Sequence, residues 1–218
     1  MAYIDFISCL HQKTSRDYMS RVEYKAAYSK KSKEFGYDYW DGDRKYGYGG
    51  YTYDGRHRPV AESLAQHYNL NASSRVLDVG CGKGYLLYEL TQVVPGIDVA
   101  GIDISTYAID NAKNEIKPFL IEGLAQDMPY VSDSFDLIIS INTLHNLYIY
   151  DLKRAISEIE RISRKNSYIV VEAYRNETEL VNLFYWQLTC ECFFTDKEWE
   201  WLFNEFAYTG DHSFIYFE

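Results

Sequence analysis

The chain has 218 residues, of which 47% are apolar and 25% charged, enough for one domain with an elaboration. Its net charge of −10 argues against a nucleic-acid partner, and no apolar run approaches the ~20 residues that cross a membrane. Four cysteines without paired zinc spacing, and an N-terminus without signal-peptide features, predict a cytoplasmic protein without a metal site.

The first 58 residues differ in charge from the rest of the chain. They hold 11 Lys and Arg against 8 Asp and Glu, although the whole chain is acidic. Residues 1–35 contain few helix breakers and predict short helices. We therefore divide the chain into an N-terminal part, residues 1–58, and a main domain, residues 59–218. The N-terminal part could also serve as the arm of a homodimer.

Residues 36–58, which we call the lid, alternate tyrosines, glycines and charged residues. Glycine joints between large flat side chains are typical of a loop that closes over a ligand, and tyrosine combines apolar area with a polar tip. A purely structural loop is the alternative. We expect three tyrosines beside the glycines, and two arginines, to reach a polar acceptor: Tyr46, Tyr48, Tyr51, Arg44 and Arg56.

Residues 76–84, Val-Leu-Asp-Val-Gly-Cys-Gly-Lys-Gly, predict a buried strand, a tight glycine turn and the start of a helix. Glycines remove side chains where the backbone turns sharply, and the helix directs its free N–H groups at the ligand. The dinucleotide fingerprint G-x-G-x-x-G has its third glycine one residue later. The spacing Asp78-x-Gly80-x-Gly82-x-Gly84 instead resembles the first motif of the class I S-adenosylmethionine-dependent methyltransferases.

This resemblance implies cofactor contacts after three successive strands. In the first motif it implicates Asp78, Gly80, Cys81, Gly82 and Gly84. After the second strand, Asp103 would bind the ribose hydroxyls with its two carboxylate oxygens, and Ile104 would pack on adenine. After the third strand, Asp127 would accept a hydrogen bond from the adenine amine, and Gln126 and Met128 would lie beside it. For each Asp taken singly, a turn or helix-cap role is the alternative.

The loop after the fourth predicted strand, residues 135–141, carries two further candidates. In the resembled family this loop faces the methionine part of the cofactor and the acceptor, which assigns Asn142 to the methionine end. His145 is the predicted general base, because neutral imidazole can take a hydroxyl proton near pH 7; orientation or packing is the alternative. Tyr48 of the lid is the second catalytic candidate. Arg175 would pair with a phosphate or carboxylate of the acceptor.

Strand and helix alternate from residue 75 to residue 173, which predicts an α/β fold with a doubly wound, mostly parallel, Rossmann-like sheet. The remaining helices are predicted from Pro59, between Ser105 and about Asn114, over residues 152–162 and from Thr195 to about Phe206. The fifth strand is predicted at residues 168–173 and the last at 212–217. The resembled family usually ends with antiparallel strands, and residues 192–194 would supply the missing one.

These motifs predict an enzyme that moves a methyl group from S-adenosylmethionine to a small acceptor by O-methylation and releases S-adenosylhomocysteine. The lid, the run INTLHNL and the Trp-rich tail are similar to a narrower group of bacterial methyltransferases found with surface-polysaccharide genes. With the locally basic lid, this predicts an anionic acceptor: a phosphorylated or nucleotide-linked sugar, or a phosphoryl-type capsule precursor. A non-catalytic S-adenosylmethionine-binding subunit or sensor and an NAD-dependent oxidoreductase are the alternatives.

Overall fold

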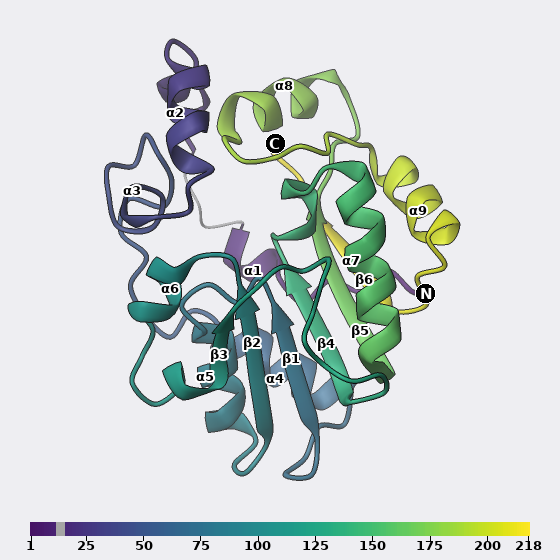
Figure 1. The fold of residues 1–218 in the computed structure, drawn as a ribbon. Coiled ribbons are helices and arrows are strands. Elements are labelled where there is room, and N and C mark those ends of the chain that lie inside the picture. Colours follow the sequence, from purple (N-terminus) through teal and green to yellow (C-terminus); the bar gives the residue numbers. More distant parts are fainter. Residues whose placement is uncertain (12–15) are drawn as a thin grey trace.

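The computed structural model describes residues 1–11 and 16–218. Its centre is a sheet of six strands in the order β3-β2-β1-β4-β5-β6, and every neighbouring pair runs parallel (Figure 1). The strands are β1 (Arg75–Val79), β2 (Asp98–Asp103), β3 (Leu120–Glu122), β4 (Phe135–Ile141), β5 (Ser163–Glu172) and β6 (Asp211–Ile215). The strand order reverses between β1 and β4, and ligands of such sheets bind at the carboxyl ends beside this point.

Helices connect and flank these strands. They are α1 (Ser8–His11), α2 (Lys25–Ser32), α3 (Tyr37–Trp40), α4 (Arg58–His67), α5 (Tyr85–Val93), α6 (Thr106–Asp110), α7 (Ile149–Ile162), α8 (Glu177–Trp186) and α9 (Asp196–Glu205), with the 3₁₀ turns η1 (Tyr18–Arg21), η2 (Lys117–Phe119) and η3 (Leu144–Asn146). Among the residues described, none of these helices has the length and apolar content that would let it span a membrane.

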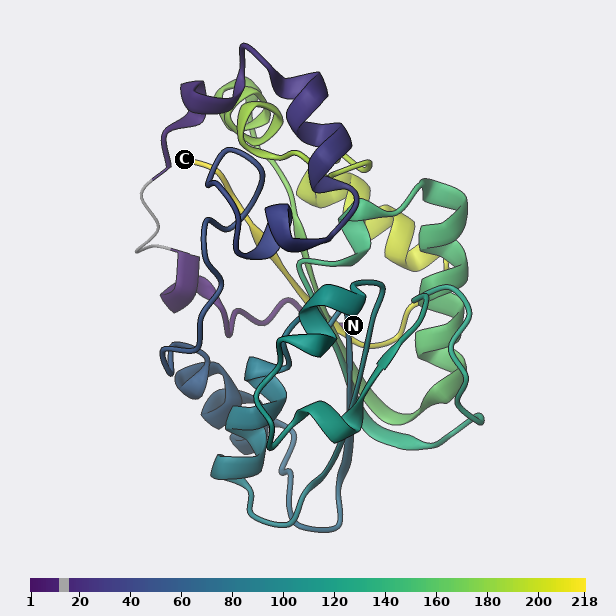
Figure 2. The ribbon, with the colours of Figure 1, turned by 60° about the vertical axis from the view of Figure 1, so that its left-hand side comes forward.

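Two apolar layers cover the two faces of the sheet (Figures 1 and 2). On one face α7 and α9 pack against the strands, and their Ile156 and Trp199 side chains are fully buried. On the other face α4 and α5 supply the buried Leu64 and Leu90. Because helical residues three or four apart lie on one face, the apolar spacing in each helix produces a continuous stripe toward the sheet.

Several predicted elements are confirmed. β4 covers residues 135–141, as its apolar run predicts. Ser105 caps the start of α6, and Thr195 forms the predicted capping box at the start of α9. α6 is shorter than predicted because the chain leaves the helix at Asn111 and turns toward η2.

The edge of the sheet beside β6 differs from the prediction. β6 runs parallel to β5, not antiparallel, and residues 192–194 form no strand. Residues 2–4, predicted to be helical, instead lie along β6: the Ile4 N–H donates to the His212 carbonyl at 2.9 Å, and the His212 N–H donates to the Ala2 carbonyl at 3.0 Å. These contacts cover the open hydrogen-bonding edge of β6.

The helices α2 and α3 lie above the carboxyl ends of the strands, near α8 (Figures 1 and 2). The Lys25 ammonium donates to the Gln187 carbonyl, and the Ser29 hydroxyl donates to the Leu188 carbonyl at 2.5 Å. The basic segment of residues 25–33 therefore packs in part against the segment after α8.

An ion pair fastens the lid to the glycine turn. Asp41, which directly follows α3, accepts hydrogen bonds from the Lys83 ammonium at 2.7 and 2.8 Å, from the Tyr107 hydroxyl at 2.8 Å and from the Tyr51 N–H at 3.0 Å. Lys83 lies inside the glycine turn, is 3% exposed and also donates to the Tyr51 carbonyl at 2.8 Å. Charge-assisted hydrogen bonds of this kind are among the stronger ones in proteins, so the lid and the turn are held as one unit.

We expect Asp41→Asn to lower the free energy of unfolding by about 2–3 kcal/mol, because it leaves the buried Lys83 ammonium without its carboxylate. Urea denaturation measures this change. Asp43→Asn is the matched control, since the Asp43 carboxylate is exposed and its ion pair with Lys45 should contribute little. Equal unfolding free energies for the two variants would contradict the anchoring role of Asp41.

Candidate active site

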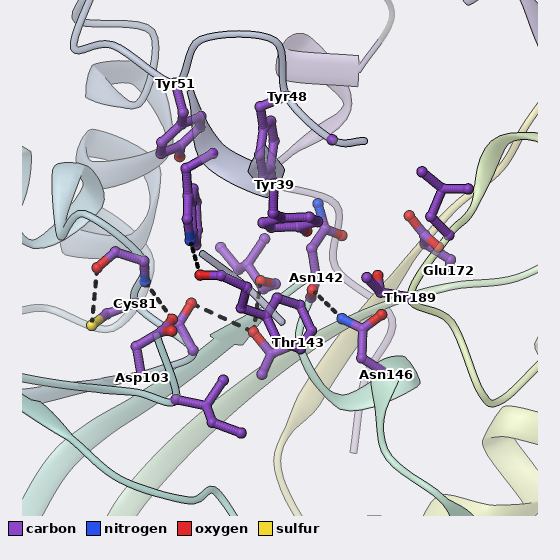
Figure 3. A pocket seen from close by; sticks show the side chains of 18 of the residues that line it. Tyr39, Tyr48, Tyr51, Cys81, Asp103, Asn142, Thr143, Asn146, Glu172 and Thr189 are labelled. Atoms are coloured by element: carbon purple, nitrogen blue, oxygen red, sulfur yellow. Dashed lines mark hydrogen bonds between the residues drawn. The ribbon is translucent and has the colours of Figure 1, made fainter. Parts of the chain in front are cut away.

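A cavity of about 530 Å³ lies between the lid and the carboxyl ends of the strands. This volume is within the usual range for small-molecule sites. Figure 3 shows its arrangement: Asp103 and Cys81 lie at one side, Glu172 and Thr189 at the other, and the lid tyrosines Tyr39, Tyr48 and Tyr51 lie above. The cavity therefore joins the predicted cofactor motif to the ends of β4 and β5.

The glycine turn can be built only with glycine at two of its positions. Gly80 has φ +80°, and a Cβ there would lie 1.9 Å from the Thr143 hydroxyl oxygen. Gly82 has φ +54°, and a Cβ there would lie 2.7 Å from the Trp40 ring. Because both the backbone conformation and the space exclude a side chain, the turn brings its backbone directly against the lid and the cavity. Trp40, which we did not select from the sequence, packs directly on the turn.

Asp103 connects the turn to the end of β2. Its carboxylate accepts the Gly82 N–H at 2.7 Å on one oxygen and the Ser105 N–H at 2.8 Å on the other. Burial raises the pKa of Asp103, and the two N–H donors partly offset this rise. A carboxylate oxygen can accept more than one hydrogen bond, so both oxygens keep capacity for ribose hydroxyls. Burial and the negative charge of Asp103 together raise the pKa of Asp78 to about 7.

Most of the predicted cofactor residues meet at the cavity wall: Asp78, Gly80, Cys81, Gly82, Asp103, Ile104, Gln126 and Asn142. Three do not. Gly84 is the N-cap of α5, and Met128 is buried in the apolar layer under α7. Asp127 is exposed and lines a separate pocket, together with Lys153 and Glu158. Gln126 therefore stands at the cavity where the resemblance implies Asp127.

Three buried oxygen acceptors in the cavity wall have no hydrogen-bond partner among the residues that the structure describes. They are Asn142 Oδ1, Asn146 Oδ1 and Glu172 Oε2. Asn142 also has φ +58°, an uncommon backbone conformation for a residue other than glycine. Buried unpaired acceptors and backbone strain concentrate where ligands bind. The donors that these oxygens lack are of the kind that a ligand ammonium or hydroxyl would supply, so the wall fits a polar, partly cationic ligand.

His145 is buried, does not line the cavity and lies behind Glu172. Its Nδ1 accepts the Glu172 N–H at 3.4 Å, and its Nε2 is 3.3 Å from Glu172 Oε2. Burial lowers the pKa of His145 to about 3 and raises the pKa of Glu172 to about 8. The group that the structure presents to the cavity is thus the Glu172 carboxyl, and His145 supports it. The sequence signal for Glu172 was its position at the end of the fifth strand.

The lid tyrosines are held by other aromatic rings. Tyr48 stacks on Trp40 with ring centroids 5.3 Å apart, and Tyr51 stacks on Tyr85 at 5.2 Å. The Tyr46 ring contacts a further tyrosine ring of the N-terminal part in an edge-to-face arrangement. All three predicted tyrosines line the cavity. Such contacts fix the rings in place before a ligand arrives, whereas a catalytic role of Tyr48 stays a prediction.

The three predicted substrate arginines have different surroundings. Arg44 and Arg56 line the cavity, whereas Arg175 is outside it and pairs with Glu179 and Glu218. Arg56 is exposed and pairs with Asp54. Arg44 has no carboxylate partner among the described residues, and its guanidinium donates to the Tyr48 carbonyl at 2.8 Å. The positive charge of Arg44 is thus the one of these three that reaches the cavity uncompensated.

The model of a methyltransferase domain family matches residues 70–210. An uncharacterised methyltransferase of Synechocystis is 31% identical over 121 residues, which are 55% of this chain and 54% of that protein. A malonyl-[acyl-carrier protein] O-methyltransferase of Legionella pneumophila is 28% identical over 99 residues, which are 44% of this chain and 34% of that protein. The chain thus spans about half or less of the length of these curated relatives.

The fold is similar to that of a solved structure. The YcgJ protein of Bacillus subtilis superposes with a TM-score of 0.55 at 21% sequence identity, and the match covers 67% of each chain. At this identity the likeness concerns the fold alone, and it agrees with a parallel sheet flanked by helices on both faces.

We expect Asp103→Asn to weaken S-adenosylhomocysteine binding at least ~10-fold. The carboxylate accepts hydrogen bonds on both oxygens, from the two N–H groups and from the ribose hydroxyls, whereas an amide has only one oxygen that can accept. Calorimetric titration measures the dissociation constant. Asp127→Asn, in the same chemical class but outside the cavity, should change it less than about twofold. The ribose assignment is wrong if both variants bind S-adenosylhomocysteine equally well. NADH, titrated in parallel, should not bind.

Proposed function

The chain belongs to the methyltransferase domain family, and we propose that it transfers the methyl group of S-adenosylmethionine to an oxygen of a small anionic acceptor. The acceptor class we propose is a phosphorylated or nucleotide-linked sugar, or a phosphoryl-type surface-polysaccharide precursor of the bacterial cytoplasm. One observation carries the proposal: a single cavity is lined by the glycine turn and Asp103 and also by Glu172 and the uncompensated Arg44. The site for the methyl donor, which carries acidic groups, would therefore lie beside the site for the acceptor, which carries a basic group.

S-adenosylmethionine is the cofactor of this domain, and we assign its binding to residues around the glycine turn. Asp103 would hold the ribose, Ile104 and Gln126 the adenine, and Asn142 and Asp78 the methionine end. The fit is supported by the unpaired Asn142 oxygen and by the two carboxyls near the turn, which suit a ligand with an ammonium and a sulfonium. When bound, the cofactor supplies a methyl group on an already activated sulfur.

The chain itself then has to align the acceptor, exclude water and take a proton. With both ligands bound, the methyl group would pass to the acceptor hydroxyl oxygen, and the electron pair of the broken carbon–sulfur bond would stay on sulfur. The hydroxyl proton passes to the Glu172 carboxylate. His145 would help to position Glu172, because its Nδ1 accepts the Glu172 backbone N–H and its Nε2 lies 3.3 Å from Glu172 Oε2. The lid aromatic rings close the cavity over the reacting groups.

The alternatives remain distinguishable by experiment. The all-parallel order of this sheet is also that of dinucleotide-binding sheets, so topology does not separate them from a methyltransferase. The glycine spacing disfavours NAD, and NADH binding to the purified protein would revive that alternative. A non-catalytic subunit or sensor would bind S-adenosylhomocysteine and transfer no methyl group.

The proposal is tested by incubating the protein with labelled S-adenosylmethionine and a panel of sugars, each offered free, as its phosphate and as its nucleoside diphosphate conjugate. We expect label transfer to the phosphorylated or conjugated members, with release of S-adenosylhomocysteine. Transfer to the free sugars alone would overturn the anionic acceptor. S-adenosylhomocysteine binding without any transfer across the panel would favour the non-catalytic alternative.

We expect kcat/KM to rise with pH and to level off above about pH 8. Only the ionised Glu172 carboxyl can accept a proton, and burial raises its pKa to about 8, so the competent fraction grows as pH increases through that value. Glu172→Gln should lower kcat about 100-fold and remove this rising limb. Glu177→Gln, an exposed residue at the start of α8, is the control. An unchanged pH profile in Glu172→Gln would exclude Glu172 as the base.

A further inference from the structure

Three arginines surround one tryptophan at the lid and α8 side of the cavity. The guanidinium carbons of Arg16, Arg21 and Arg44 lie 6.0, 4.3 and 5.0 Å from the centroid of the Trp186 ring. All four residues line the cavity. Because they come from the N-terminal segment, from the lid and from the end of α8, only the folded chain brings them together. We call them the arginine cluster.

The positive charge of the arginine cluster is not compensated. No ion pair joins any of its three guanidinium groups to an Asp or Glu among the residues described, and residues 12–15 contain neither amino acid. Lys25 adds a fourth cation beside the cluster, on the Gln187 carbonyl. Burial, followed by the charge of Arg44, lowers the pKa of Arg21 to about 10, and burial and Arg21 lower the pKa of Lys25 to about 8. The folded chain therefore holds together cations that repel one another.

Arg21 and Arg44 donate hydrogen bonds to backbone carbonyls, whereas Arg16 contacts only aromatic rings among the residues that the structure describes. Arg21 is 4% exposed and donates to the carbonyls of Trp186 at 2.8 Å, of Arg44 at 2.6 Å and of Gly47 at 2.7 Å. Arg44 donates to the Gly47 and Tyr48 carbonyls at 3.0 and 2.8 Å. Arg16 donates no hydrogen bond to any residue that the structure describes, and its buried Nε has no partner. Its guanidinium lies 4.8 Å from the centroid of the Phe217 ring.

We propose that the arginine cluster is the binding site for a phosphoryl group of the acceptor, either a phosphate monoester or a diphosphate. This inference rests on the proposed function, because it places the anionic part of the acceptor at one side of the cavity and leaves the glycine turn to the cofactor. Guanidinium groups match phosphate oxygens in pairs of parallel hydrogen bonds, and a group with two negative charges suits several uncompensated cations better than a single carboxylate does.

The position of the cluster relative to Glu172 supports the assignment. The charge of Arg16 acts on Glu172 and lowers its pKa against the effect of burial, so the two side chains lie within electrostatic reach. An acceptor held at the cluster by its phosphoryl group would therefore bring its neighbouring atoms to the Glu172 side of the cavity. The Trp186 ring would hold the guanidinium groups beside the anion, because an aromatic face attracts cations.

The test is calorimetric titration of the protein with inorganic pyrophosphate, inorganic phosphate and acetate, with and without saturating S-adenosylhomocysteine. We expect pyrophosphate to bind most tightly and acetate not to bind. Arg16→Gln should weaken pyrophosphate binding at least ~10-fold, because it removes a guanidinium group that donates no hydrogen bond to any residue the structure describes. Arg154→Gln, an exposed arginine far along the chain on α7, is the charge-matched control and should change binding less than about twofold.

The outcomes separate this inference from the proposed function. The phosphoryl site is overturned if Arg16→Gln and Arg154→Gln weaken pyrophosphate binding equally, or if the unmodified protein does not bind pyrophosphate. The arginines would then serve only to hold the lid against α8. Failure of S-adenosylhomocysteine to bind would count against the proposed function alone, since the anion titration is also done without it. With an active acceptor, Arg16→Gln should raise KM at least ~10-fold and leave kcat nearly unchanged.

Discussion

The ion pair between Lys83 and Asp41 is the contact on which the site depends. Lys83 belongs to the glycine turn and Asp41 to the lid, so one ion pair with a buried ammonium fixes how two segments more than forty residues apart meet. Trp40 packs on Gly82 because of this meeting, and the lid tyrosines stack above it. The upper wall of the cavity is consequently not an independent loop but a continuation of the turn.

The cavity combines two electrostatic environments in a chain that is acidic overall. Around the glycine turn, Asp78 and Asp103 are buried close enough for one to raise the pKa of the other, which favours a cationic ligand. At the arginine cluster the charges are positive and form no ion pair with any Asp or Glu in the part of the chain that the structure describes, which favours an anion. A cofactor that carries a sulfonium and an acceptor that carries a phosphate would then each be attracted to its own side. The field of the folded chain would thereby orient both ligands before any specific contact forms.

The sequence predicts the local features of this protein well and the long-range ones poorly. The glycine turn, β4 and the position of Asp103 follow from spacing within single segments, and the structure has them where predicted. The parallel pairing of β6 with β5 and the pairing of β6 with residues 2–4 join segments that are distant in sequence, and no periodicity within a single segment encodes either pairing. Arg44 and Arg56 look equivalent in the sequence, but only the fold reveals which has a carboxylate beside it. Gln126 and Asp127 were both predicted beside the cofactor, but only Gln126 lines the main cavity, because no strand register constrains side-chain direction in this irregular loop.

The contacts of the N-terminal segment with the segment after α8 have a consequence for how the protein assembles. Arg21 and Trp186 are 165 residues apart, and Lys25 and Gln187 are 162 apart. During synthesis Arg21 and Lys25 are made 165 and 162 residues before their partners at the end of α8. Contacts of such high sequence separation form slowly, because a long loop must close before they contribute stability. The central strands would therefore pair before Arg21 and Lys25 dock on the end of α8, and this side of the cavity would be completed late in folding.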